Sequence, residues 1–155
     1  MTIRLLTAAA TLSFSAGAAL ALEPIELTNT YPLNEQVYML SDRGFFTQDN
    51  VGYFEVIEGP FTGGPARCIG SGFVLADSTN TISGICIFGD GADTFTMRWE
   101  AGDRGAANDW TIAAGTGKYE GMSGEGTAIT GSDEKFRSLP VRTTHIVGFV
   151  DFPVD

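Results

Sequence analysis

The chain has 155 residues, of which 43% are hydrophobic, and a formal net charge of −10 at pH 7. An acidic protein of this kind repels phosphate backbones and anionic lipid headgroups, so neither nucleic acid nor a membrane surface is an expected partner. The length is that of one domain with a single hydrophobic core.

The first 21 residues have the three parts of a secretory signal peptide. Arg4 provides the positive charge, a Leu/Ala/Phe stretch follows, and Ala19-Leu20-Ala21 provides the small residues of a cleavage site. The apolar run is too short, and too rich in Ala, Ser and Thr, for a membrane span of about 20 residues. We therefore expect residues 1–21 to be a signal peptide and residues 22–155 to form one domain, located in the periplasm or secreted.

After residue 21, short runs of β-branched and aromatic residues are separated by Gly, Pro, Asn and Asp. No stretch has a 3.6-residue period over a helical length, whereas several alternate between apolar and polar residues. In the clearest case, Phe95, Met97 and Trp99 share one face. The pattern predicts an all-β fold with strands at 25–30, 36–41, 51–58, 67–75, 82–89, 93–100, 109–114, 125–130 and 141–150.

Two cysteines, Cys68 and Cys86, are expected to enter an oxidising compartment, where a disulfide is the default. A hairpin that joins 67–75 to 82–88 through a turn at 77–80 places the two cysteines almost directly opposite each other. Paired Cα atoms of neighbouring antiparallel strands are close enough for a disulfide. We therefore predict a Cys68–Cys86 bond.

Eight or nine short strands with regular turns form either a barrel or a sandwich. Glycines inside the predicted strands, such as Gly70, Gly84 and Gly148, favour a barrel, because strong strand coiling needs positions without a side chain. We predict a small antiparallel barrel built from these strands. A barrel of this size is either filled by side chains or holds one small ligand.

The sequence offers little for metal, cofactor or nucleophile chemistry. It has one histidine, His145, and its cysteines are expected to be paired, so we predict no metal site and no cofactor. His145 lies on an apolar strand face, which favours a hydrogen-bonded core histidine over a catalytic or ligand-contacting one. Gly121-Met122-Ser123-Gly124-Glu125 misses the nucleophile-elbow pattern at its last position.

The most distinctive segment runs from Gly115 to Gly126 and contains the glycines of the pattern G-x-G-x-[YF]-x-G-x-x-G-x-[GV], with Tyr119 at the aromatic position. This segment resembles the signature of the allene oxide cyclase-like barrels and of the related dirigent proteins. The residues around Cys68 and Cys86, up to the Gly89-Asp90-Gly91 turn, resemble exported bacterial members of that group.

The resemblance implies a small, calycin-like, eight-stranded antiparallel barrel, often trimeric, with an apolar cavity. The plant cyclase folds an unstable fatty-acid epoxide in its pocket with help from a glutamate on its first strand, and dirigent proteins steer coupling reactions. Glu26 and Glu35 fall in the comparable region here, but neither matches the motif, so neither is assigned a catalytic role.

We expect the barrel to bind a small apolar molecule in its lumen. One alternative is a cyclase or isomerase that uses the same cavity, for which Glu55, Tyr53 and His145 are the residues to examine. Another is a filled barrel that serves as an oligomerisation or interaction module. Strand alternation makes seven residues candidates for the lumen lining, with ordinary core packing as the alternative role: Phe54, Val56, Phe73, Phe95, Met97, Trp99 and Phe149.

Overall fold

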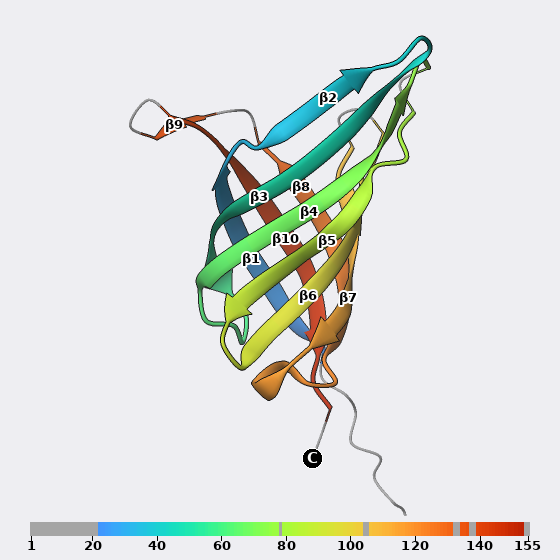
Figure 1. Cartoon of the computed structure of the whole chain (residues 1–155). Helices are drawn as coiled ribbons and strands as arrows, with labels where there is room; N and C mark the ends of the chain where they lie inside the picture. The colour runs from blue at the N-terminus through green and yellow to red at the C-terminus, as the bar shows by residue number, and fades with distance from the viewer. Residues whose placement is uncertain (1–21, 78, 104–105, 132–133, 137–138, 154–155) are drawn as a thin grey trace, which may run out of the picture.

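The computed structural model describes residues 22–77, 79–103, 106–131, 134–136 and 139–153, and the expected signal peptide lies outside this part. The described residues form ten strands and a short 3-10 helix, η1 (Figure 1). No helix among them is long and apolar enough to cross a membrane. The strands are β1 (Glu23–Pro32), β2 (Glu35–Met39), β3 (Arg43–Glu58), β4 (Gly64–Leu75), β5 (Ser83–Asp90), β6 (Asp93–Glu100), β7 (Asn108–Gly115), β8 (Ser123–Thr130), β9 (Glu134–Phe136) and β10 (Leu139–Asp151), and η1 is Gly117–Tyr119.

Eight of the strands close into an antiparallel barrel, as the alternation predicts. The sheet order is β1-β10-β8-β7-β6-β5-β4-β3, and β1 also pairs with β3, which closes the ring. β2 is an additional strand that pairs with the first half of β3, and β9 pairs with the start of β10. β2 and the beginning of β3 therefore extend past the barrel at its upper end (Figure 1).

Strand β3 is twice as long as the predicted strand at 51–58. The polar run Thr47-Gln48-Asp49-Asn50 interrupts the apolar pattern, and such a run is typical of a loop. In the structure this run is a continuous strand paired with β4. Gln48 faces the interior at the upper end of the barrel, where the surroundings are polar, so the hydrophobic pattern is interrupted without a turn.

The predicted disulfide is confirmed. Cys68 and Cys86 are directly opposite in the β4–β5 hairpin, and their sulfur atoms are bonded at 2.02 Å. In the predicted turn at 77–80, Ser78 lies outside the described residues. On either side of it the hairpin continues, because the Thr81 amide donates to the Phe73 carbonyl.

An aromatic cluster fills the lower half of the barrel. Phe95 is fully buried and stacks on Phe61 and Phe88, with ring centroids 4.4 Å and 4.9 Å apart. Phe54 contacts the same group edge-on, and Tyr119 of η1 contacts Phe95 from below at 5.2 Å. Each buried ring contributes roughly 1.5–3 kcal/mol through the hydrophobic effect. This cluster closes the lower end of the lumen.

Higher in the barrel, both tryptophans lie against strand positions that have no side chain. Trp99 and Trp110 are cross-strand neighbours on β6 and β7, and each indole covers a glycine pair on the next two strands. A Cβ at Gly70 would lie 2.3 Å from the Trp99 ring, and a Cβ at Gly148 would lie 2.5 Å from the Trp110 ring. The glycines inside the strands thus make room for two large rings. The row around the barrel reads Gly70, Gly84, Trp99, Trp110, Gly126, Gly148.

Candidate ligand-binding site

A cavity of about 190 Å³ occupies the upper half of the barrel, above the aromatic cluster. The Cys68–Cys86 disulfide forms part of its wall, and both tryptophans line it. Apolar side chains provide most of the remaining surface, so the cavity suits a largely apolar molecule. These side chains are Phe46, Ile82, Phe88, Met97, Ala101, Ala128 and Ile146.

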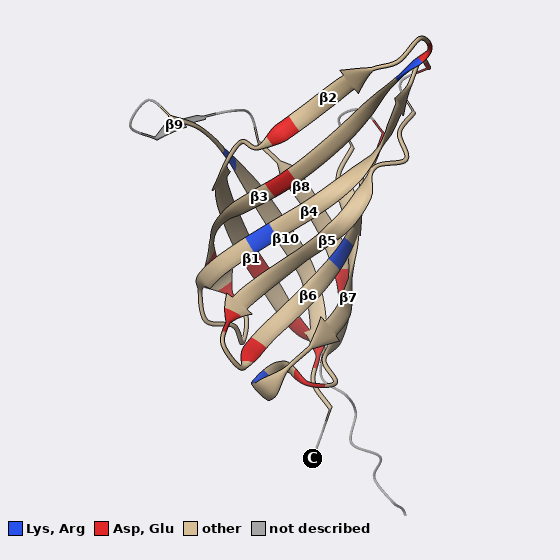
Figure 2. Ribbon diagram, in the orientation of Figure 1, with Lys and Arg blue, Asp and Glu red and all other residues tan. Residues whose placement is uncertain are grey.

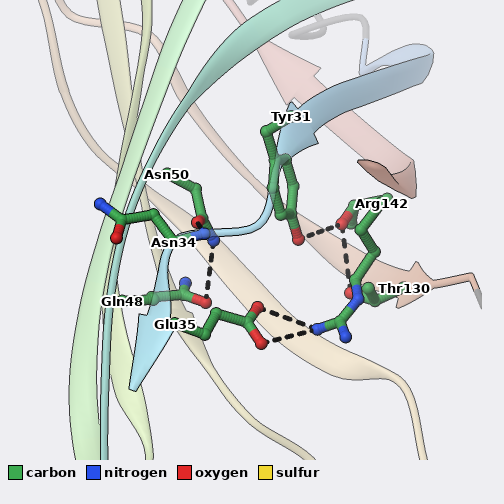
Figure 3. A network of polar contacts seen from close by, with 8 residues as sticks. Tyr31, Asn34, Glu35, Gln48, Asn50, Thr130 and Arg142 are labelled. Carbon is green, nitrogen blue, oxygen red and sulfur yellow. Dashed lines mark hydrogen bonds and ion pairs between the residues drawn. The ribbon is translucent and has the colours of Figure 1, made fainter. Parts of the chain in front are cut away.

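An ion pair lies at the mouth of the cavity. Glu35 is the first residue of β2, and Arg142 lies near the start of β10; Arg142 Nη1 donates to both carboxylate oxygens of Glu35, at 2.8 Å and 3.0 Å (Figure 3). The two side chains are 18% and 25% exposed. Because the charges compensate each other, the pair makes the mouth polar while adding little net charge.

Three hydroxyl groups form a chain beside the ion pair. The Tyr31 and Thr144 hydroxyls are 3.2 Å apart, and the Thr144 and Thr130 hydroxyls are 3.1 Å apart (Figure 3). Burial raises the pKa of Tyr31 above its ordinary value of 10.0, and the hydrogen bond with Thr144 opposes that rise. Tyr31 is therefore a neutral hydroxyl group in the cavity wall at physiological pH.

Asn50 fixes the break between β1 and β2. Pro32 has no backbone N–H for the sheet, and β1 ends there. The Asn50 side chain is 1% exposed. Its Oδ1 accepts a hydrogen bond from the backbone N–H of Asn34 at 2.8 Å, and its Nδ2 donates to Gln48 Oε1. This contact positions the start of β2, and hence Glu35, over the mouth (Figure 3).

No protein-family profile and no curated protein matches the sequence of this chain. Among solved structures it is similar to the pterocarpan synthase dirigent protein GePTS1, with a TM-score of 0.52 over 94% of this chain and 100% of that one. The fold is a dirigent-like barrel. Sequence identity is 11%, so the similarity concerns the fold.

In this dirigent-like barrel, the seven predicted lumen residues fall into three groups. Met97 and Trp99 line the cavity. Phe54, Phe95 and Val56 belong to the core below it or pack against that core. Phe73 and Phe149 do not point into the lumen, and their predicted orientation was wrong.

Phe73 lies on the outer face beside Phe45, with ring centroids 5.1 Å apart, because the inward position of that pair of strands is taken by Phe46 opposite Gly72. Phe149 is 53% exposed. The inner face of β10 instead carries Arg142, Thr144 and Ile146, which line the cavity. Both faces of β10 contain apolar residues, so alternation alone could not distinguish inside from outside.

The three residues examined for catalysis also lie outside the lumen. Tyr53 is 54% exposed, and Glu55 is exposed on the same face of β3. His145 is exposed on β10, with its Nε2 2.8 Å from Glu26 Oε1. The cavity therefore offers none of the three to a bound molecule. In the described part of the chain, no three His, Cys, Asp or Glu side chains are grouped so that they could hold a metal ion.

The polar residues at the mouth were not selected from the sequence as site residues. Glu35 and Arg142 are 107 residues apart, and only the closed ring brings β2 next to β10. β2 carries one acidic position, and Figure 2 shows another acidic position on the neighbouring strand β3, so the acidic residue of β2 does not stand out by its charge. The sequence of β10 did contain one indication of a polar lumen: Arg142 and Thr144 are two residues apart, so they lie on the same face of the strand.

Proposed function

We propose that this protein is an exported barrel that binds a small, predominantly apolar molecule in the upper half of its lumen. The observation that carries the proposal is the cavity of about 190 Å³, closed below by aromatic rings and bordered above by polar side chains. A dry apolar cavity of about 150 Å³ is large enough to accept benzene. The space therefore fits a compact ligand with one ring or of similar size.

The distribution of side chains favours binding over a filled barrel. The cluster of Phe54, Phe61, Phe88 and Phe95 fills only the lower half, and the tryptophan rings lie against glycines, which leaves space in the upper half open. The polar groups are concentrated at the mouth, where they can orient a ligand without lining its apolar part.

Export is supported by the disulfide, because such bonds form and persist in oxidising compartments. Together with the signal-like N-terminal segment, it supports a location in the periplasm or outside the cell.

Native mass spectrometry of the full chain, recovered from an oxidising compartment, tests the proposal. Ala128→Phe places a ring in the cavity, whereas Ala113→Phe places the same ring at an exposed position of the neighbouring strand β7. We expect a small molecule to accompany wild type and Ala113→Phe and to be absent from Ala128→Phe. Equal small-molecule content in all three proteins would contradict lumen binding. The same spectrum gives the number of subunits. It therefore also tests whether the protein forms a homo-oligomer, which the family resemblance implies to be a trimer.

A cyclase or isomerase, as the resemblance to allene oxide cyclase-like barrels implies, is the second candidate function. The observation that favours it is the half-buried Glu35 carboxylate at the mouth, which replaces Glu55 as the candidate proton-transfer group. Its test uses the molecule identified above. Conversion that is lost in Glu35→Gln while binding is kept supports catalysis, and no conversion by wild type contradicts it.

A further inference from the structure

Strand β2 has a hydrogen-bonding edge that no described strand covers. It is the last strand in the sheet order, and among the described strands it pairs with β3 alone. Closing a sheet into a ring removes its free edges, so β2, which lies outside the ring, keeps an edge that the barrel does not protect. Glu35 ties the start of β2 to Arg142 of β10, and the rest of the strand extends past the barrel (Figure 1).

The backbone groups on this edge belong to Val37 and Met39. In an antiparallel ladder, residues that bond to the neighbouring strand alternate with residues whose N–H and C=O point away from it. The Leu40 N–H donates to the Arg43 carbonyl of β3 at 2.8 Å, so Leu40 and, two residues earlier, Tyr38 bond to β3. Val37 and Met39 therefore direct their donors and acceptors toward the free edge.

The side chains of β2 are apolar on both faces of the strand. A Cβ at Gly44 would lie 3.3 Å from Val37 Cγ1 and 3.8 Å from Met39 Sδ, so Val37 and Met39 share one face. Tyr38 and Leu40 lie on the other face, and all four residues are at least 50% exposed. A strand that is apolar on both faces is typical of the interior of a sheet. Edge strands are commonly protected by Lys or Pro, and β2 contains neither.

The charges around β2 allow a second copy of this acidic chain to approach it. The chain has a formal net charge of −10, so two copies repel each other over most of their surface. No residue from 36 to 40 is charged. The charges at the two ends of this stretch are compensated within the chain, because Glu35 pairs with Arg142 and Asp42 pairs with Arg43 (Figure 2).

The sequence of β2 is also complementary to itself in the antiparallel direction. Pairing about Tyr38 places Tyr38 opposite the partner's Tyr38 and Val37 opposite the partner's Met39. The backbone groups of Val37 and Met39 both point to the free edge, so this pair exchanges hydrogen bonds across the twofold axis. The register joins apolar residues to apolar residues and leaves Glu35 beyond the paired segment.

From these observations we infer that β2 is a docking strand for a second copy of this chain. The two β2 strands pair antiparallel about a twofold axis, so that one sheet continues from barrel to barrel. The exposed apolar side chains of each strand then pack against those of the other. The inference does not depend on what the lumen binds.

Sedimentation velocity of the full chain, recovered from an oxidising compartment and measured over a range of concentrations, tests the inference. Wild type should pass from monomer to dimer as its concentration rises. In Tyr38→Lys and in Tyr38→Glu, like charges face each other across the axis, and we expect the dimer dissociation constant to rise about tenfold in each. An equimolar mixture of the two variants should dimerise again, because the charges are then opposite.

Ile129→Lys is the matched control. Ile129 is 61% exposed on β8 in the barrel wall, so the variant makes the same exchange of an exposed apolar residue for a charge, away from β2. Its dimerisation should equal that of wild type. Val37→Pro tests the backbone pairing, because it removes an N–H that points away from β3. It should abolish the dimer and leave the far-UV circular dichroism unchanged; if it fails to fold, the Tyr38 variants decide.

Several results would overturn the inference. Wild type that stays monomeric at every concentration, or that forms a trimer, excludes a twofold contact between β2 strands. Equal weakening in Tyr38→Lys and Ile129→Lys, or a mixture of the Tyr38 variants that stays dissociated, places the contact elsewhere. A folded Val37→Pro that dimerises like wild type excludes strand pairing. A foreign peptide bound to wild type and absent from Tyr38→Lys would show that another chain, and not a second copy, occupies the edge.

Discussion

Reduction of the Cys68–Cys86 bond provides a quantitative test of how the barrel is stabilised. The two cysteines are 18 residues apart in sequence. In the loop-entropy account, a cross-link over a loop of this length lowers the entropy of the unfolded chain and stabilises the folded state by about 3 kcal/mol at 25 °C. For a domain of this length, that corresponds to roughly 10 °C in melting temperature.

The assay is urea unfolding of oxidised and fully reduced wild type, followed by circular dichroism, with the mass increase of two hydrogens confirming reduction. The oxidised form should be the more stable by about 3 kcal/mol. A Cys68→Ala/Cys86→Ala double variant is the control, because its unfolding should not respond to reductant.

Coincident unfolding curves for the oxidised and reduced forms would refute this reasoning. They would mean that the β4–β5 hairpin keeps its ends together in the unfolded ensemble without the bond, so that the cross-link removes no chain entropy.

Three further predictions concern residues at and around the cavity. Gly70→Ala should destabilise the barrel by about 1–3 kcal/mol and alter its near-UV circular dichroism, because the new Cβ would overlap the Trp99 ring; Ser71→Ala, on the exposed face of the same strand, should do neither. Because the pKa of Tyr31 is raised on folding, its protonation stabilises the fold fully below pH 10, and this contribution is lost as pH rises through the higher pKa of the folded state. The stability gap between wild type and Tyr31→Phe should therefore narrow in alkaline urea titrations, and a constant gap would contradict the shift. His145→Ala should change the free energy of unfolding by less than about 1 kcal/mol, since the imidazole is exposed and pairs with Glu26. It should also leave unchanged the amount of small molecule that accompanies the protein in native mass spectrometry; a smaller amount would place His145 in the binding site.

The fold class was predictable because the local signals agree. Phe95, Met97 and Trp99 alternate with polar residues and are all buried, and the spacing of Cys68 and Cys86 defined a hairpin with the observed register. The glycine-rich segment was also informative in physical terms. Gly117 and Gly121 adopt positive φ around η1, and Gly126 lies under the Trp110 ring.

The site was less predictable because the lumen is apolar at the bottom and polar at the top. Gln48 and Arg142 point inward at the mouth, so a rule that places apolar residues inside assigns their neighbours incorrectly. Phe149 illustrates the error, since it is a large apolar residue on the outer face of the strand whose inner face holds Arg142. The contact between Glu35 and Arg142 depends on barrel closure, which no local pattern in a single sequence reports.

The aromatic floor of the lumen has a kinetic consequence. A pore open at both ends allows one molecule to follow another through it, whereas a blind tube has a single route for arrival and departure. An occupant held above Phe88 and Phe95 must leave past Glu35 and Arg142 before a successor can take its place. Exchange in such a tube is strictly dissociative, so the dissociation rate of a bound molecule is independent of the concentration of a competing molecule in solution.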